Sequence, residues 1–176
     1  MTTRTLSVTL ALTLVATGAL AQAPRDSALV HAVSHSITTY PRFTIFDDLS
    51  VTAQEGTVTL RGKVTMPFKR DDIQKRVERI TGVDVVKNEI EVLPVSIYDE
   101  KLRRTIARAI YGNPSFWRYA AMANPPIHIV VENGRVTLTG VVSSEVDRTL
   151  ARSLATGHGG FSVVNALRTD ADARSH

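Results

Sequence analysis

Residues 55–64 read Glu-Gly-Thr-Val-Thr-Leu-Arg-Gly-Lys-Val, and residues 133–142 read Asn-Gly-Arg-Val-Thr-Leu-Thr-Gly-Val-Val. The glycines, valines, threonine and leucine of the first stretch recur in the second at a constant offset of 78 residues. A repeated strand of this kind indicates that one small structural unit occurs twice in the chain. Two copies of a small module favour a binding or scaffolding protein over an enzyme with a single active-site cleft.

The hydrophobic periodicity on either side of each copy predicts the same order of elements: helix, strand, strand, helix, strand. In the first half we expect a helix over Ser27–Thr39, strands over Val51–Ala53 and Thr57–Lys63, a helix from Pro67 to Ile80 and a strand over Val83–Val92. In the second half we expect a helix over Asp99–Tyr111 capped by Asp99, strands over Ile127–Glu132 and Arg135–Val142, a helix opened by Ser144 and a strand over Phe161–Leu167.

The predicted fold is therefore α+β, with two tandem αββαβ modules over residues 25–93 and 98–170 and a disordered tail at 171–176. Each module should be a three-stranded mixed sheet with two helices on one face. On the second helix of the first module we expect Phe68, Ile73, Val77 and Ile80 to face the core. On the second helix of the second module we expect Val146, Leu150 and Leu154 to do so. A module this small buries only about 60% of its unfolded surface. Because the linker at 93–97 is short and apolar, we expect the two modules to pack on each other.

The N-terminal segment has the composition of a secretory signal peptide over residues 1–21. Arg4 precedes an apolar run from Leu6 to Leu20, and small residues follow that allow cleavage after Ala21 or Ala23. The alternative is a membrane anchor, but the run is interrupted by serine and threonine and is shorter than the roughly 20 apolar residues that a span needs. We therefore expect a periplasmic or secreted protein with no transmembrane span after cleavage.

The composition excludes several classes of protein. The chain has no cysteine, which rules out a disulfide framework and an N-terminal lipid anchor on cysteine. Residues 25–94 balance ten basic against ten acidic side chains, whereas residues 95–176 hold ten against seven. This excess is too small for a dedicated nucleic-acid binder. An anionic membrane surface is the more natural partner for a mild positive bias in an exported protein.

The repeated glycines have a structural explanation. Gly56 and Gly134 fall where a two-residue hairpin turn needs a positive φ, which costs glycine little. Gly62 and Gly140 lie inside the returning strand, which indicates a bulge or a close approach by a helix. A phosphate-binding loop is disfavoured, because the spacing that opens a helix after such a loop is missing.

The two halves resemble the BON domain, a bacterial envelope module, over nearly the whole mature chain. After the Glu/Asn-Gly-x-Val-Thr-Leu-x-Gly strand comes Gly-Val-Asp-Val-Val-Lys-Asn-Glu-Ile at 82–90, and the second copy has Gly-Phe-Ser-Val-Val-Asn-Ala-Leu at 160–167. Phe161 replaces the usual valine, so the second copy is the looser match. The resemblance implies a non-catalytic exported protein associated with phospholipid binding, envelope integrity and osmotic stress. With two modules, a signal peptide and no lipid-anchor cysteine, the chain looks like the soluble periplasmic, osmotically inducible members of that family.

No residue pattern predicts catalysis, a metal site or a cofactor. His31 and His35 lie four apart on a predicted helix, but no third ligand follows at a suitable spacing, and a solvated helix face explains them. No Gly-x-Ser-x-Gly sequence frames a nucleophile. We therefore predict no enzyme activity, no metal and no cofactor.

One candidate binding surface lies in the second module. Lys101, Arg104 and Arg108 fall on one side of the helix at 99–111, and we call these three residues the basic stripe. The segment 112–126, which we call the aromatic loop, is about five residues longer than its counterpart in the first module and carries Phe116, Trp117 and Arg118. Cations and interfacial aromatic residues suit an anionic bilayer. The alternative is that the aromatic residues cover the core and the cations are merely solvated.

These patterns support two functional hypotheses. In the first, the protein associates with anionic phospholipid or with envelope components during osmotic or envelope stress, using Lys101, Arg104, Arg108, Phe116, Trp117 and Arg118. In the second, it is a periplasmic adaptor or chaperone-like protein that binds envelope proteins through an open sheet face or an inter-module groove, without contacting lipid.

Overall fold

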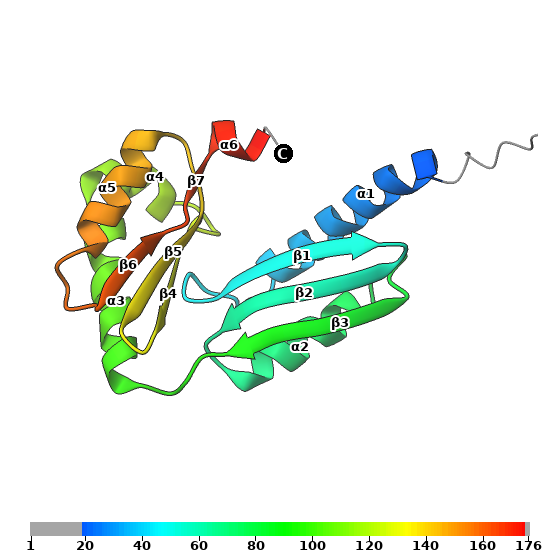
Figure 1. The fold of residues 1–176 in the computed structure, drawn as a ribbon, viewed down its shortest axis with the longest axis horizontal. Helices are drawn as coiled ribbons and strands as arrows, with labels where there is room; N and C mark the ends of the chain where they lie inside the picture. The colour runs from blue at the N-terminus through cyan, green and yellow to red at the C-terminus, as the bar shows by residue number, and fades with distance from the viewer. Residues whose placement is uncertain (1–18, 175–176) are drawn as a thin grey trace, which may run out of the picture.

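A computed structural model describes residues 19–174 of the chain, in which two αββαβ modules follow one another (Figure 1). The first contains α1 (Ala19–Thr38), β1 (Asp48–Gln54), β2 (Thr57–Val64), α2 (Pro67–Val77) and β3 (Val85–Val92). The second contains α3 (Ile97–Tyr111), the short 3-10 helix η1 (Pro114–Phe116), α4 (Trp117–Ala120), β4 (Ile127–Glu132), β5 (Arg135–Val142), α5 (Glu145–Ala155), β6 (Ser162–Asn165), β7 (Arg168–Thr169) and α6 (Asp170–Arg174). The predicted fold class is confirmed.

Both sheets have the predicted mixed topology. In the order β1-β2-β3, β1 and β2 form an antiparallel hairpin and β3 lies parallel to β2. In the second module, β4 and β5 form the hairpin, and β6 and β7 pair in turn with successive parts of β5. The strand expected at 161–167 is therefore shorter, and a second short strand continues the same edge.

Each module has its own hydrophobic core between its sheet and its helices (Figure 1). Val58 and Leu60 of β2, and their counterparts Val136 and Leu138 of β5, are fully buried. Ile73 and Val77 face the core as predicted, but Phe68 is 41% exposed and Val146 is 73% exposed. Both exposed residues belong to the first turn of their helix, where fewer neighbouring elements reach the side chain.

The hairpin turns are built as the sequence predicts. Glu55-Gly56 and Asn133-Gly134 each have two consecutive positive φ angles, near 50° and 75°. Gly62 and Gly140 also have positive φ, but the expected bulge or close helix is replaced by a neighbouring strand or its flank. A Cβ at these glycines would collide with the backbone carbonyl oxygen of Asp48 or Pro126.

The sequence analysis predicted that Asp99 caps its own helix, and this prediction is wrong. Ser96 is the N-cap of α3, and its hydroxyl accepts a hydrogen bond from the Asp99 amide at 3.2 Å. The buried Asp99 carboxylate instead accepts hydrogen bonds from the amides of Asn133 and Gly134, both at 2.8 Å. Asp26 of the first module accepts one weaker bond from Glu55 in the same way, at 3.2 Å.

Both ends of the chain differ from expectation. α1 begins at Ala19, earlier than the expected Ser27, and residues 1–18 of the predicted signal peptide lie outside the described residues. The segment 171–174, expected to be disordered, belongs to α6. A reciprocal capping pair explains this helix, because the Thr169 hydroxyl accepts from the Asp172 amide while the Asp172 carboxylate accepts from the Thr169 amide.

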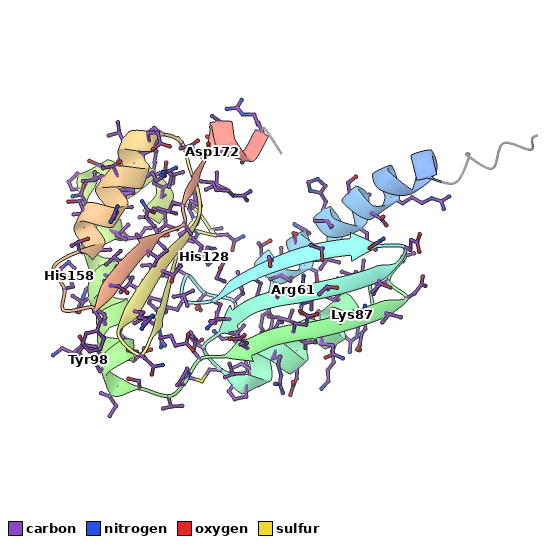
Figure 2. All side chains as sticks on the ribbon, viewed as in Figure 1. Arg61, Lys87, Tyr98, His128, His158 and Asp172 are labelled. Carbon is purple, nitrogen blue, oxygen red and sulfur yellow. The ribbon has the colours of Figure 1, made fainter. Side chains whose placement is uncertain are left out.

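The two modules pack on each other through the segment 43–47, which connects α1 to β1. The amide of Ile129 on β4 donates to the carbonyl oxygen of Ile45 at 2.7 Å. The His128 ring lies 5.6 Å from the Phe43 ring, with Nδ1 2.5 Å from the carbonyl oxygen of Asp47. Figure 2 shows His128 between the two modules. The predicted packing of the modules is confirmed.

Asp47 fixes this connecting segment. Its carboxylate is fully buried and accepts five hydrogen bonds, from the amide and hydroxyl of Thr44, the amide and hydroxyl of Thr65, and Nζ of Lys69 at 2.6 Å. Lys69 is itself only 5% exposed. The carboxylate therefore ties the start of α2 and the end of β2 to the connecting segment that contacts the second module.

We predict that Asp99→Ala lowers the free energy of unfolding by about 1–3 kcal/mol, because it leaves two backbone N–H groups without their acceptor. Urea unfolding followed by circular dichroism measures the loss. Asp26→Ala is the matched control, and we expect a smaller effect since Asp26 accepts a single, longer bond. Equal losses for the two variants would contradict the prediction.

We predict that Asp47→Asn destabilises the protein by about 3–5 kcal/mol, because it leaves the buried ammonium group of Lys69 without its counter-charge. The double variant Asp47→Asn/Lys69→Met should be more stable than the sum of the two single variants implies, since no buried charge is left unpaired. A double-mutant cycle in urea measures the coupling. Additive single effects would show that the ion pair is not the source of the stabilisation.

Candidate functional site

The basic stripe lies on the outer face of α3. Leu102, Ile106 and Ile110 of this helix are buried in the core of the second module. Lys101, Arg104 and Arg108 lie on the exposed side of the same helix. The sequence prediction that these three cations share one exposed face is therefore confirmed.

Glu100 offsets part of the positive charge of the stripe. Its carboxylate lies 2.7 Å from Nε of Arg104 and 3.2 Å from a terminal nitrogen of Arg103. The hydrogen bond from Arg104 lowers the pKa of Glu100, so this carboxylate is ionised at neutral pH. Within residues 19–174, neither Lys101 nor Arg108 forms an ion pair, which leaves their charges available to a ligand.

Arg103 differs from its neighbours on α3. The sequence places it at the flank of the stripe, but its side chain is 4% exposed and donates to the carbonyl oxygen of Val131 at 2.8 Å. Its Nε is buried and has no acceptor among the described residues. Arg103 therefore fastens α3 to β4 and does not extend the exposed stripe.

The aromatic loop divides its aromatic residues between the core and the surface. Phe116, at the end of η1, is fully buried, and Tyr119 of α4 is 3% exposed. Trp117 between them is 70% exposed, and Met122 is also exposed. The alternative interpretation of the sequence, that these residues cover the core, therefore holds for Phe116 and not for Trp117. We leave Phe116 out of the candidate contact surface because its ring does not reach the surface.

Arg118 holds the aromatic loop in place. A terminal nitrogen lies 2.5 Å from a carboxylate oxygen of Asp147 and donates to the Tyr119 hydroxyl at 2.9 Å. Its guanidinium also lies 4.6 Å from the centre of the Tyr119 ring. The hydrogen bond with Tyr119 raises the pKa of Arg118. Because Asp147 already balances the charge of Arg118, this residue contributes less to an anion-binding surface than the stripe does.

The loop lies beside the C-terminal end of the stripe. Arg108 lines a shallow apolar depression of about 400 Å³ together with Tyr111 and with Ala120 of α4. Trp117 precedes Ala120 by three residues in the single turn of α4 and therefore lies on the same side of that turn. The short helix that carries the exposed Trp117 thus shares this depression with Arg108 through Ala120.

Two residues at the opposite end of the stripe were missed in the sequence. Val95 is completely exposed and Ile97 is 89% exposed, although both belong to the short apolar linker between the packed modules. Ile97 precedes Lys101 by four residues, so it continues the exposed face of α3. The spacing of four residues would have predicted this position from the sequence if the helix had been expected to begin at residue 97 instead of 99.

The described residues hold no cluster suited to a metal ion and no membrane-spanning helix. No three His, Cys, Asp or Glu side chains between residues 19 and 174 lie close enough together to hold a metal ion. In the same part of the chain, no helix has the length and hydrophobicity to cross a membrane.

Comparisons with known proteins agree with the repeated module. The model of the BON domain matches residues 26–94 and again residues 98–171. No curated protein gives a significant match. Two solved structures of CdsD, a structural protein of the type III secretion system of Chlamydia trachomatis, share 14% and 15% of residues with this chain.

The likeness to CdsD is weak. For the structure described as its C-terminal domain, the match has a TM-score of 0.34 and covers 82% of this chain and 66% of that one. For the other, the TM-score is 0.29 and the match covers 81% of this chain and 92% of that one. Similarity at this level carries no argument about function.

Proposed function

Because this chain belongs to the BON domain family, whose members are often linked to membrane or phospholipid binding, we propose that it binds the surface of anionic phospholipid membranes without catalysis. The contact surface is the exposed face of the second module, made of Lys101, Arg104, Arg108 and Trp117. The observation that carries the proposal is the 70% exposure of Trp117, on a short helix whose Ala120 shares a surface depression with Arg108.

The chemistry of these side chains suits the headgroup region of a bilayer. Each cation near an anionic membrane surface contributes about 1 kcal/mol, and this attraction fades within a Debye length. Tryptophan prefers the level of the headgroups, where its ring is partly buried and its N–H can still meet water. Exposure of a large aromatic ring to water forgoes the stabilisation of burial, and the headgroup level of a bilayer restores part of it.

The proposal includes an exported location, periplasmic or secreted, and a role in osmotic or envelope stress. The support is the signal-peptide composition of residues 1–21 and the resemblance to two-module BON proteins of the osmotically inducible type. Anionic phospholipid headgroups are the partner that an exported protein with this surface would meet.

A second candidate function is that of an adaptor for envelope proteins. The observation in its favour is β3, which has a strand neighbour on one side only and forms an eight-residue edge of the first sheet (Figure 1). An edge strand can pair with an extended segment of another protein. This strand carries Lys87, labelled in Figure 2, and two neighbouring glutamates. Their charges restrict such pairing to segments that carry complementary charges.

We predict that reversing the stripe with Lys101→Glu, Arg104→Glu and Arg108→Glu weakens binding to anionic vesicles by roughly a hundredfold or more, since three attractive charges become repulsive. Co-sedimentation with phosphatidylglycerol-containing and with purely phosphatidylcholine vesicles measures the effect. Trp117→Ala should weaken the binding further and remove the blue shift of tryptophan fluorescence on vesicle addition.

The matched control reverses three other exposed cations of the second module, with Arg135→Glu, Arg152→Glu and Arg168→Glu. This variant has the same net charge as the stripe variant and should lose much less affinity. Equal recovery with anionic and neutral vesicles, or equal losses in the two triple variants, would rule out the proposed surface. Binding of an envelope protein that survives high salt and both triple reversals would favour the adaptor function.

A further inference from the structure

A groove of about 630 Å³ lies where the two modules meet on the side of the linker. Its walls come from the connecting segment after α1, the start of α2, the linker and the start of α3. We call it the linker groove, and its lining includes Arg42, Met66, Phe68, Val95, Ile97 and Arg104. Neither module could form it alone.

The linker groove gathers several of the exposed large apolar side chains of the described chain. Val95 and Ile97 project from the linker side, and Met66 and Phe68, 50% and 41% exposed, stand on the side of α2. Leaving such side chains in water forgoes the stabilisation that burial would give them. Exposed apolar residues collected in one concave site mark a binding site for an apolar group.

The charge of the groove is positive. Arg42, Lys69, Arg103 and Arg104 line it, against the single carboxylate of Glu100. The buried carboxylate of Asp47 compensates Lys69, so four cations face two carboxylates and an excess of two positive charges remains. The Arg42 guanidinium lies 5.1 Å from the centre of the Phe68 ring, which places a cation directly beside the apolar wall.

Arg103 contributes positive charge to the wall of the groove. Its side chain is more than nine-tenths buried at the wall of the groove, and its Nε has no acceptor among the described residues. A buried guanidinium N–H without an acceptor is costly, and such groups usually have a partner supplied by water or by a ligand. An anion at this end of the groove would be attracted by the positive charge of Arg103.

We propose that the linker groove binds one long-chain fatty acid in its carboxylate form. The alkyl chain lies against Val95, Ile97, Met66 and Phe68, and the carboxylate pairs with a rim arginine, Arg42 or Arg104. A single apolar chain with one anionic end matches a groove whose apolar and cationic side chains lie side by side. The groove takes up a single molecule, whereas the membrane contact of the second module engages a surface. Arg104 belongs to both sites, Arg42 lines the groove alone, and Arg108 belongs to the stripe alone.

Isothermal titration of the full-length protein with sodium dodecanoate, below its critical micelle concentration, tests the proposal. Dodecyltrimethylammonium, with the same alkyl chain and the opposite charge, is the matched probe. We expect saturable binding of one dodecanoate per chain, at least about tenfold tighter than the cationic probe, because the rim arginines attract one head group and repel the other. Equal binding of the two probes, or no saturation, would overturn the proposal.

Ile97→Glu places a carboxylate in the groove and should weaken dodecanoate binding by about tenfold or more. The matched control is Val146→Glu, which changes another exposed apolar residue in the first turn of a helix, α5, away from the groove. It should bind dodecanoate like the unchanged protein. Circular dichroism melting shows whether both variants are folded, and Val95→Asp provides a second groove variant at a completely exposed position.

Other occupants give different results. Sedimentation velocity tests whether the groove instead holds a second copy of the chain. A dimer that is dissociated by the Ile97→Glu substitution but is not dissociated by dodecanoate would mean that the proposal is wrong. Arg108→Glu separates the two proposed functions, because Arg108 does not line the groove. It should weaken vesicle binding and leave dodecanoate binding unchanged. Loss of vesicle binding alone therefore reports on the membrane surface, and loss of dodecanoate binding alone reports on the groove.

Discussion

The buried carboxylate of Asp47 is the interaction on which the arrangement of the modules depends. Five donors surround it, and they come from the connecting segment, the end of β2 and the start of α2. The same segment presents the carbonyl oxygens of Ile45 and Asp47 to β4 of the second module. Burying a carboxylate is unfavourable unless it is fully paired, so the segment has little freedom to move without losing this compensation. The position of the linker groove follows from that constraint.

The two modules carry side chains of opposite charge at one equivalent position. Lys69 and Asp147 stand at equivalent positions, 78 residues apart, in the first turn of the second helix of each module. Lys69 reaches back to Asp47, and Asp147 accepts from Arg118 and Tyr119. In both modules an ion pair ties this helix to the loop that follows the first helix. In the second module the tie also fixes the longer aromatic loop, which keeps Trp117 at the surface.

The two proposed binding features arise where the copies differ or meet. The hairpins, the aspartates that accept hydrogen bonds from the hairpin amides, and the core residues recur, and they build the scaffold. The basic stripe and the aromatic loop belong to the second copy alone, and the linker groove needs residues from both. A duplicated module thus gains binding surfaces through its divergent loop and its junction, while the shared strands keep their structural role.

The sequence alone determined the fold, because a repeated Gly-x-Val-Thr-Leu-x-Gly strand with its period of two, its hairpin glycines and its flanking amphipathic helices allows few arrangements. It also located the stripe, since Lys101, Arg104 and Arg108 share a helix face by spacing alone. The tertiary structure decided which of the aromatic residues are buried, because Phe116 and Trp117 are adjacent in a loop without periodicity and only packing separates them. It also decided that Asp99 holds a distant turn and that Val95 and Ile97 remain exposed. These outcomes depend on which elements meet in space, and that information is carried by contacts between residues far apart in the chain.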